Sequence, residues 1–191
     1  MNDVIRTGDL DPTFKFDIAK VVGGEKIKRC FNCTGCTVTC PITEIDETFN
    51  PRKILRKAII GMREEVLTDP SIWRCASCYM CYDHCPQDVR ITEVLGAIRH
   101  IAEKEAEEGK IKIDSDKPLF EKYFIDSIKK HGRVHELMPV VHFIWKTKGI
   151  GGLMEYRNTG MSMFLKGKIN LLPHSVKGKK DIKKIFSGVK K

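Results

Sequence analysis

Cysteine is the residue type in this chain with the most regular spacing. All eight cysteines fall in two runs of four, and each run reads C-x2-C-x2-C-x3-C-P. The first run starts at Cys30, and the second starts 45 residues later at Cys75. Deprotonated thiols are soft ligands, suited to zinc, copper(I) and iron–sulfur clusters. The two runs therefore predict metal chemistry, and their repetition predicts two similar centres.

The spacing within each run favours a 4Fe–4S cluster. A cubane cluster needs four thiolates, and three cysteines separated by two residues can wrap one loop around three of its irons. In bacterial two-cluster ferredoxins, which use this run, the fourth cysteine binds the other cluster. The proline after it fixes φ and has no N–H, so the chain leaves the loop there. The predicted ligands are Cys30, Cys33, Cys36 and Cys85 for cluster one, and Cys75, Cys78, Cys81 and Cys40 for cluster two.

Zinc sites and disulfides are the alternative uses of eight cysteines. Zinc typically takes two separated CxxC pairs, which gives no reason for a third cysteine at the same interval or for the Cys-Pro ending. A disulfide framework suits small secreted chains. Residues 1–20 carry four aspartates and no apolar stretch, so we expect no signal peptide. Iron–sulfur clusters remain the best interpretation.

A helix is predicted after the first cysteine run. Asn50 is a good N-cap, and Pro51 suits the first helical position. Asp69-Pro70 should end the helix. Apolar residues between these limits share one face at helical spacing, which indicates packing into a core. They are Ile54, Leu55, Ala58, Ile59, Met62 and Val66.

A second helix is predicted over about residues 89–107, with Gly109 as its end. Between Cys40 and Cys75 lie 34 residues, mostly of helical pattern, where a small α+β ferredoxin has short hairpins. The fold class predicted is therefore all-α: an α-helical ferredoxin domain with two 4Fe–4S cluster loops, plus a helical and extended basic C-terminal extension.

We expect the chain to divide into three parts. Residues 1–29 form an N-terminal arm, mostly loop, with a short helix possible. Phe14, Phe16 and Ile18 alternate like a strand, whereas Phe14, Ile18, Val21 and Val22 fit one helical face. Residues 30–109 form the dicluster domain, and residues 110–191 form the extension.

The extension shows three more helical stretches after residue 115. They are 116–132, opened by Asp116 and Pro118 and closed by Gly132; 134–148, kinked or started by Pro139; and 153–165, interrupted by Gly160 and preceded by a flexible glycine joint at 149–152.

Positive charge is concentrated in the extension. Residues 1–110 hold 16 Lys/Arg and 18 Asp/Glu, whereas residues 111–191 hold 18 and 7. The end, residues 166–191, has nine lysines and one acid, with Leu171, Leu172, Ile182, Ile185 and Phe186 interleaved. This end is either a solvated tail or an arm that orders on a partner subunit. Binding to nucleic acid or an anionic membrane is the third interpretation, and no recognised nucleic-acid fold accompanies it.

The remaining residues contain no convincing catalytic set. None of the six histidines forms an HExxH or comparable pair, and the glycines at 149–152 lack phosphate-loop spacing. We therefore assign no catalytic residue and no site for an organic cofactor. His84 is a candidate for tuning a cluster, and Trp73 and Tyr79 are expected to exclude solvent from the second run.

The cytoplasm is the expected location. The longest apolar run, Val140 to Trp145, is interrupted by His142, so we expect no transmembrane segment. Reduced thiols without an export signal suit a reducing compartment.

The chain resembles the α-helical ferredoxin domains of respiratory-type oxidoreductases, and within them the C subunit of heterodisulfide reductase from methanogenic archaea. One departure is Thr34-Gly35, where that family often has glycine directly after the second cysteine. The segments that carry the resemblance are Cys75–Gln87 (CASCYMCYDHCPQ), Asn50-Pro51-Arg52, Ile91-Thr92-Glu93-Val94, Met163–Lys168 (MFLKGK) and Leu171–His174 (LLPH).

The resemblance implies an electron relay. In that family the C subunit takes electrons from a flavin-containing A subunit and passes them to a B subunit. The B subunit reduces the coenzyme M–coenzyme B heterodisulfide in methanogenesis, and hydrogenase or formate dehydrogenase can join the wider complex. An iron–sulfur subunit of another respiratory-type enzyme is the nearest alternative, although those usually carry further cysteines. A cluster-containing protein that binds nucleic acid is the alternative from another class.

Overall fold

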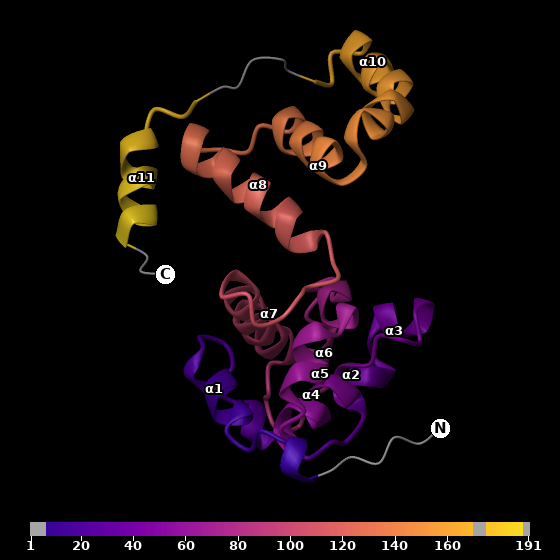
Figure 1. Ribbon diagram of the computed structural model, residues 1–191, viewed down its shortest axis with the longest axis vertical. Coiled ribbons are helices and arrows are strands. Elements are labelled where there is room, and N and C mark those ends of the chain that lie inside the picture. Colours follow the sequence, from indigo (N-terminus) through magenta and orange to yellow (C-terminus); the bar gives the residue numbers. More distant parts are fainter. Residues whose placement is uncertain (1–6, 170–174, 189–191) are drawn as a thin grey trace. The chain divides into compact units, whose positions relative to one another are not determined.

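The structure, a computed structural model, describes residues 7–169 and 175–188. All regular secondary structure in these residues is helical, which confirms the predicted all-α fold for this part of the chain. The chain divides into two compact units, Met1–Ser115 and Asp116–Lys191, and each is described by itself (Figure 1). We call them the N-terminal unit and the C-terminal unit.

The N-terminal unit holds all eight cysteines on short helices and loops between longer helices. Its α-helices are α1 (Phe14–Lys20), α2 (Gly35–Val38), α3 (Pro41–Ile45), α4 (Pro51–Ile60), α5 (Arg63–Thr68), α6 (Met80–Asp83) and α7 (Ile91–Glu107), and its 3₁₀ helices are η1 (Thr7–Asp9), η2 (Ile27–Arg29) and η3 (Pro70–Arg74).

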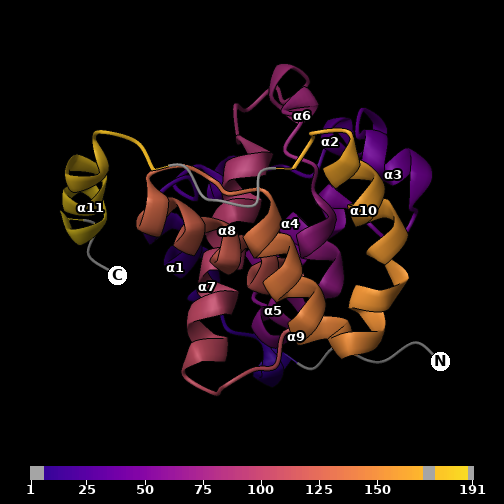
Figure 2. The same cartoon turned by 90° about the horizontal axis from the view of Figure 1, so that it is seen from above.

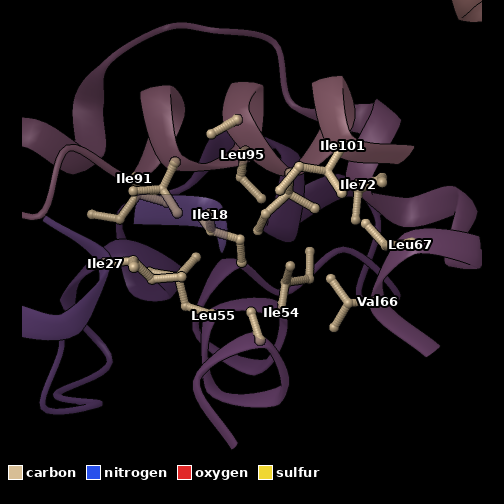
Figure 3. Close-up of a cluster of buried hydrophobic side chains, with 14 of the residues drawn as sticks. Ile18, Ile27, Ile54, Leu55, Val66, Leu67, Ile72, Ile91, Leu95 and Ile101 are labelled. Carbon is tan, nitrogen blue, oxygen red and sulfur yellow. The ribbon is translucent and has the colours of Figure 1, made fainter. Parts of the chain in front are cut away.

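One apolar core holds this unit together. Helices α1, α4, α5 and α7 each bury one face, and Figure 3 shows Ile18, Leu55, Val66 and Leu95 from these helices gathered in one cluster. These four side chains are at most 1% exposed. Full burial of such a side chain stabilises the fold by about 1.5–3 kcal/mol before entropy is counted. The helices that follow the two cysteine runs, α4 and α7, are therefore part of one body.

Helix α4 begins as predicted. The side-chain oxygen of Asn50 accepts a hydrogen bond from the Lys53 N–H at 3.0 Å, and Pro51 occupies the first turn. This cap satisfies one of the N–H groups that have no partner inside the helix.

The helix ends earlier than predicted. The apolar periodicity pointed to one helix as far as Asp69, but the chain breaks at Gly61 and restarts as α5 at Arg63. Gly61 has φ +95°, and its carbonyl accepts a hydrogen bond from the Asp11 N–H at 2.7 Å. The break therefore arises because the N-terminal arm approaches the backbone there, which helical periodicity does not reveal.

The N-terminal arm forms a short helix and enters the core. Phe14 and Ile18 of α1 are completely buried. The guanidinium of Arg63 donates to Asp11 and Asp17 at 2.9 Å each and to Glu105 at 2.6 and 2.9 Å. One arginine thus ties the arm and α5 to α7.

Helix α7 matches its prediction closely. It runs over Ile91–Glu107, and Gly109 follows it with φ +73°. A glycine takes this left-handed conformation without the steric penalty that a Cβ imposes.

The C-terminal unit contains α8 (Lys117–His131), α9 (Leu137–Glu155), α10 (Arg157–Leu165) and α11 (Lys179–Gly188). Helices α8 and α9 lie side by side (Figure 2), and the rings of Phe120 and Phe143 meet edge to face with centroids 5.4 Å apart. The predicted limits of α8 are confirmed, including the cap at Gly132.

The predicted glycine joint is smaller than expected. Only Gly149 departs from helical geometry, with φ +63° and ψ −152°, and α9 continues beyond this kink. Gly160 does not interrupt α10. The predicted tail residues Leu171 and Leu172, with the rest of the Leu171–His174 segment, lie outside the described residues.

Few apolar side chains are buried in the C-terminal unit. The buried apolar core that the described residues form lies entirely in the N-terminal unit. Most of the exposed large apolar residues lie instead in the C-terminal unit: Phe120, Phe124, Ile125, Met138, Val140, Trp145, Ile150, Met154, Tyr156, Met161, Met163, Phe164, Leu165 and Ile185. No helix in the part of the chain that the structure describes is long and apolar enough to cross a bilayer.

Candidate metal centre

The two cysteine loops have the same backbone conformation. Asn32 and Thr34 in the first loop have φ of +66° and +81°, and the equivalent Ser77 and Tyr79 have +54° and +63°. Left-handed conformations are unfavourable for residues with a Cβ and persist where the surroundings over-determine them. Alternation of right- and left-handed residues directs successive N–H groups into a concavity, an arrangement found around iron–sulfur and phosphate groups.

A short helix follows each loop, and the two helices contact each other. Thr34 precedes α2 and Tyr79 precedes α6 at matching positions of the repeat. A Cβ atom added to Gly35 of α2 would lie 2.9 Å from the carbonyl oxygen of His84. The loops are therefore packed against each other beside Cys85, and the small size of Gly35 permits it.

The first cavity joins the two runs. Its walls enclose about 340 Å³, a volume that includes space open to solvent. Three cysteines of the first run line it together with the last cysteine of the second. They are Cys30, Cys33, Cys36 and Cys85.

The second cavity shows the reciprocal arrangement. It also encloses about 340 Å³ and is lined by three cysteines of the second run and the last cysteine of the first: Cys75, Cys78, Cys81 and Cys40. Cys36 lines this cavity as well, so the two cavities are neighbours. The structure thus places all eight predicted ligands around two neighbouring cavities, and which four cysteines bind each cluster stays a prediction.

The walls of the two cavities differ in charge. Arg52, in the first turn of α4, lines the first cavity, whereas the residues that line the second are apolar apart from the thiols and Thr92. Each cavity has a hydrogen bond to a thiol sulfur from a residue outside the cysteine runs: Val89 N–H donates to Cys85 Sγ at 3.3 Å, and Thr92 Oγ1 lies 3.5 Å from Cys81 Sγ. Sequence reasoning missed these neighbours, although Arg52 directly follows the recognised Asn-Pro cap.

Burial disfavours the charged form of several thiols. It raises the pKa of Cys36 to about 11, because desolvation outweighs the hydrogen bond from Thr37. The pKa values of Cys30 and Cys81 are also raised, chiefly by desolvation. Without metal these thiols are protonated at neutral pH, so metal binding must release protons.

The donor set fits a cluster better than a single ion. Within residues 7–169 and 175–188 no three His, Cys, Asp or Glu side chains converge closely enough to share one metal ion. A tetrahedral zinc site draws its sulfurs to about 2.3 Å from the metal. Thiols spaced around a cavity, in loops whose left-handed residues are typical of anion-binding concavities, suit the larger anionic core of a cubane cluster.

The aromatic residues predicted to exclude solvent behave differently from each other. Trp73 is buried and Tyr79 is 52% exposed, and neither lines a cavity, so exclusion of solvent from the second run stays a prediction for both. The Tyr79 ring packs edge to face on Tyr82, with centroids 5.1 Å apart. His84, the predicted tuning residue, is exposed.

Comparison with known proteins agrees with this geometry. Residues 26–89 match the 4Fe–4S dicluster domain family. The chain is 37% identical over 102 residues to the C subunit of the H2:CoB-CoM heterodisulfide,ferredoxin reductase of Methanothermobacter thermautotrophicus, covering 53% of this chain and 54% of that protein. It is 40% identical over 102 residues to the second iron–sulfur C subunit of the CoB–CoM heterodisulfide reductase of Methanocaldococcus jannaschii, covering 53% and 50%.

A longer but weaker match extends further along the chain. The iron–sulfur C subunit of the CoB–CoM heterodisulfide reductase of Methanopyrus kandleri is 28% identical over 155 residues, covering 73% of this chain and 79% of that protein. The matches to the other two proteins span about half of their length. Residues 26–89 are therefore a 4Fe–4S dicluster domain that holds two 4Fe–4S clusters, and the chain is a homologue of the iron–sulfur C subunits of CoB–CoM heterodisulfide reductases.

Proposed function

We propose that this protein is the electron-transfer subunit of a heterodisulfide reductase complex. The observation that supports this most directly is the pair of neighbouring cavities, each lined by three cysteines of one run and the last cysteine of the other. We assign cluster one to Cys30, Cys33, Cys36 and Cys85, and cluster two to Cys75, Cys78, Cys81 and Cys40. The clusters, when bound, supply one-electron chemistry.

The protein's own residues position the ligands and control access to them. The left-handed residues of each loop suit a concavity of N–H groups, an arrangement that stabilises negative charge. Ile91 lines both cavities and is 2% exposed, which limits water between the two centres. Cys33 and Cys78 occupy the same position in the two runs, and both are exposed. They therefore mark where electrons enter and leave.

The names of the homologues support a complex with other subunits. We propose a flavin-containing A-type subunit as donor and a B-type catalytic subunit as acceptor, the latter reducing the coenzyme M–coenzyme B heterodisulfide. Hydrogenase or formate dehydrogenase would belong to the wider complex, because related subunits are named for H2- and formate-dependent reductases. This chain would have no substrate site of its own and would act in the reducing cytoplasm.

Residues 110–191 are proposed to dock on a partner subunit. Exposed apolar side chains are concentrated there, and the region carries 18 basic against 7 acidic residues. A stable domain of this size normally buries such side chains, so a partner that covers them accounts for the pattern.

The test is anaerobic purification from the native host, followed by stopped-flow oxidation and reduction of the clusters. We expect co-purification with a flavoprotein and a Cys-Cys-Gly-repeat subunit, and clusters that exchange electrons with both. Recovery of the chain alone or with nucleic acid, or clusters inert to these subunits, would contradict the proposal.

Replacing Cys85 with serine tests the ligand assignment. The variant should lose the cluster bound by Cys30, Cys33 and Cys36 and keep the other, as counted by iron analysis and EPR spectroscopy. Cys40→Ser is the matched control and should give the reverse. Loss of the cluster bound by Cys75, Cys78 and Cys81 from the Cys85 variant would show that the fourth ligands are not exchanged.

A further inference from the structure

A basic groove lies beside the first cavity. It is a hollow of about 990 Å³, space open to solvent included, along one side of α4. Four cations line it, Arg52, Lys53, Arg56 and Lys57, and two half-buried apolar residues, Ile60 and Met62, form part of its wall.

The positive charge of the groove is only partly compensated. Lys57 pairs with Glu65, the one acid in the lining, with Nζ and Oε1 2.7 Å apart. The side chains of Arg52, Lys53 and Arg56 have no ion pair among the described residues. Three cations on one face, without acidic partners, create a field that attracts a negatively charged group.

Two lining residues connect the groove to the metal centre. Asn32 and Arg52 line both the groove and the first cavity. Each has a buried polar atom without a hydrogen-bond partner, Oδ1 of Asn32 and Nε of Arg52. Such atoms normally have a partner. Both lie where the groove meets the wall of the first cavity, so a change in the groove is next to the metal centre.

We propose that this groove is the docking site for an acidic segment of the protein that exchanges electrons with cluster one. The inference rests on the proposed electron-transfer function and adds the location and charge of the contact. A polypeptide fits better than nucleic acid, because Ile60 and Met62 in the wall of the groove accept apolar side chains. A sugar–phosphate backbone has no apolar side chains to place there. A carboxylate-rich segment seated there would lie against the wall of the first cavity.

The test uses the full chain with both clusters, handled anaerobically, and a fluorescent oligoglutamate peptide as probe. The variant Lys53→Glu/Arg56→Glu should weaken binding roughly tenfold or more at low salt. The variant Lys183→Glu/Lys184→Glu, on exposed α11, has the same charge change outside the groove and should weaken binding by no more than about twofold.

A redox titration followed by EPR gives the second measurement. Saturating peptide should lower the reduction potential of cluster one and leave that of cluster two unchanged, because negative charge beside a cluster opposes electron uptake. An equal loss of binding in the two charge-reversal variants would overturn the proposal, as would a single-stranded DNA of equal charge that binds the groove more tightly. The peptide could bind the groove as expected while the clusters fail to exchange electrons with the partner subunits. That result would contradict the proposed function but not the proposed docking site.

Discussion

Replacing Gly61 with alanine should destabilise the N-terminal unit strongly, although Gly61 touches neither cavity. Gly61 separates α4 from α5 at φ +95°. A Cβ atom built on it would lie 2.6 Å from the carbonyl carbon of Asp11, in contact with backbone that has little freedom to move. The substitution therefore forces the N-terminal arm away from the helix junction.

The expected loss combines three effects. A left-handed conformation costs a residue with a Cβ about 1–2 kcal/mol. Forcing extra volume into a packed contact costs about 1–3 kcal/mol. The hydrogen bond from Asp11 N–H to Gly61 C=O, 2.7 Å long, contributes about 0.5–1.5 kcal/mol. We expect a total of about 3–5 kcal/mol, which is a large part of the 5–15 kcal/mol typical of a folded domain.

Thermal unfolding under anaerobic conditions measures this loss, with far-UV circular dichroism and cluster absorbance as readouts. For a chain of this size each kcal/mol lowers Tm by about 2–4 °C, so Gly61→Ala should lower it by roughly 6–20 °C. Gly109→Ala is the matched control: Gly109 has φ +73°, but nothing lies within 4 Å of an added Cβ. It should show only the conformational cost of about 1–2 kcal/mol.

The difference between these variants isolates the contact with the arm. Equal losses would refute the argument that Asp11 presses on Gly61. Wild-type stability of Gly61→Ala would show that the arm does not occupy this place.

Further predictions concern the metal centre and the arginine network. Arg52→Gln removes a positive charge from the wall of the first cavity and should lower the reduction potential of cluster one by about 59 mV, a tenfold change in the equilibrium. An EPR-monitored redox titration measures this. Lys53→Gln makes the same charge change outside the cavity and should lower the potential less. Gly35→Ala should reduce iron content at cluster one first, because its Cβ would lie 2.9 Å from the carbonyl oxygen next to Cys85. Arg63→Met should cost about 2–4 kcal/mol in denaturant unfolding, because it leaves three carboxylates without their shared partner.

The arginine network also makes the free energy of unfolding depend on pH in the acidic range. Hydrogen bonds from Arg63 hold the pKa of Asp17 below its ordinary value, and bonds from Thr13, then Arg63, do so for Asp11. A carboxyl with a lowered folded pKa stabilises the fold above its unfolded pKa of about 3.9 and loses that contribution as pH falls below it. The acid-unfolding curve of Arg63→Met should therefore be shallower in this range. The argument about acid would be contradicted by an unchanged unfolding curve for Arg63→Met. The argument about the cavity cation would be contradicted by equal reduction potentials for Arg52→Gln and Lys53→Gln. Full iron content in Gly35→Ala would contradict the argument about the contact beside Cys85.

The sequence alone determined the chemistry of the centre and the class of the fold. Cysteine spacing is a local property, because three ligands of one cluster must come from one short loop, and the repeat of the run predicted the second centre. The caps at Asn50 and Gly109 and the periodicity of α7 and α8 are local as well, and they predicted where these helices begin or end.

The tertiary structure decided what depends on contacts between distant segments. Gly61 breaks the predicted helix because Asp11, 50 residues earlier, approaches its backbone. Arg52 and Val89 are far apart in the sequence, but both line the first cavity. The second cavity has no cation in its lining, and only the fold shows this difference. Periodicity reports which face of a helix is apolar, but not what covers it, and for this reason the exposed apolar faces of the C-terminal unit were not foreseen.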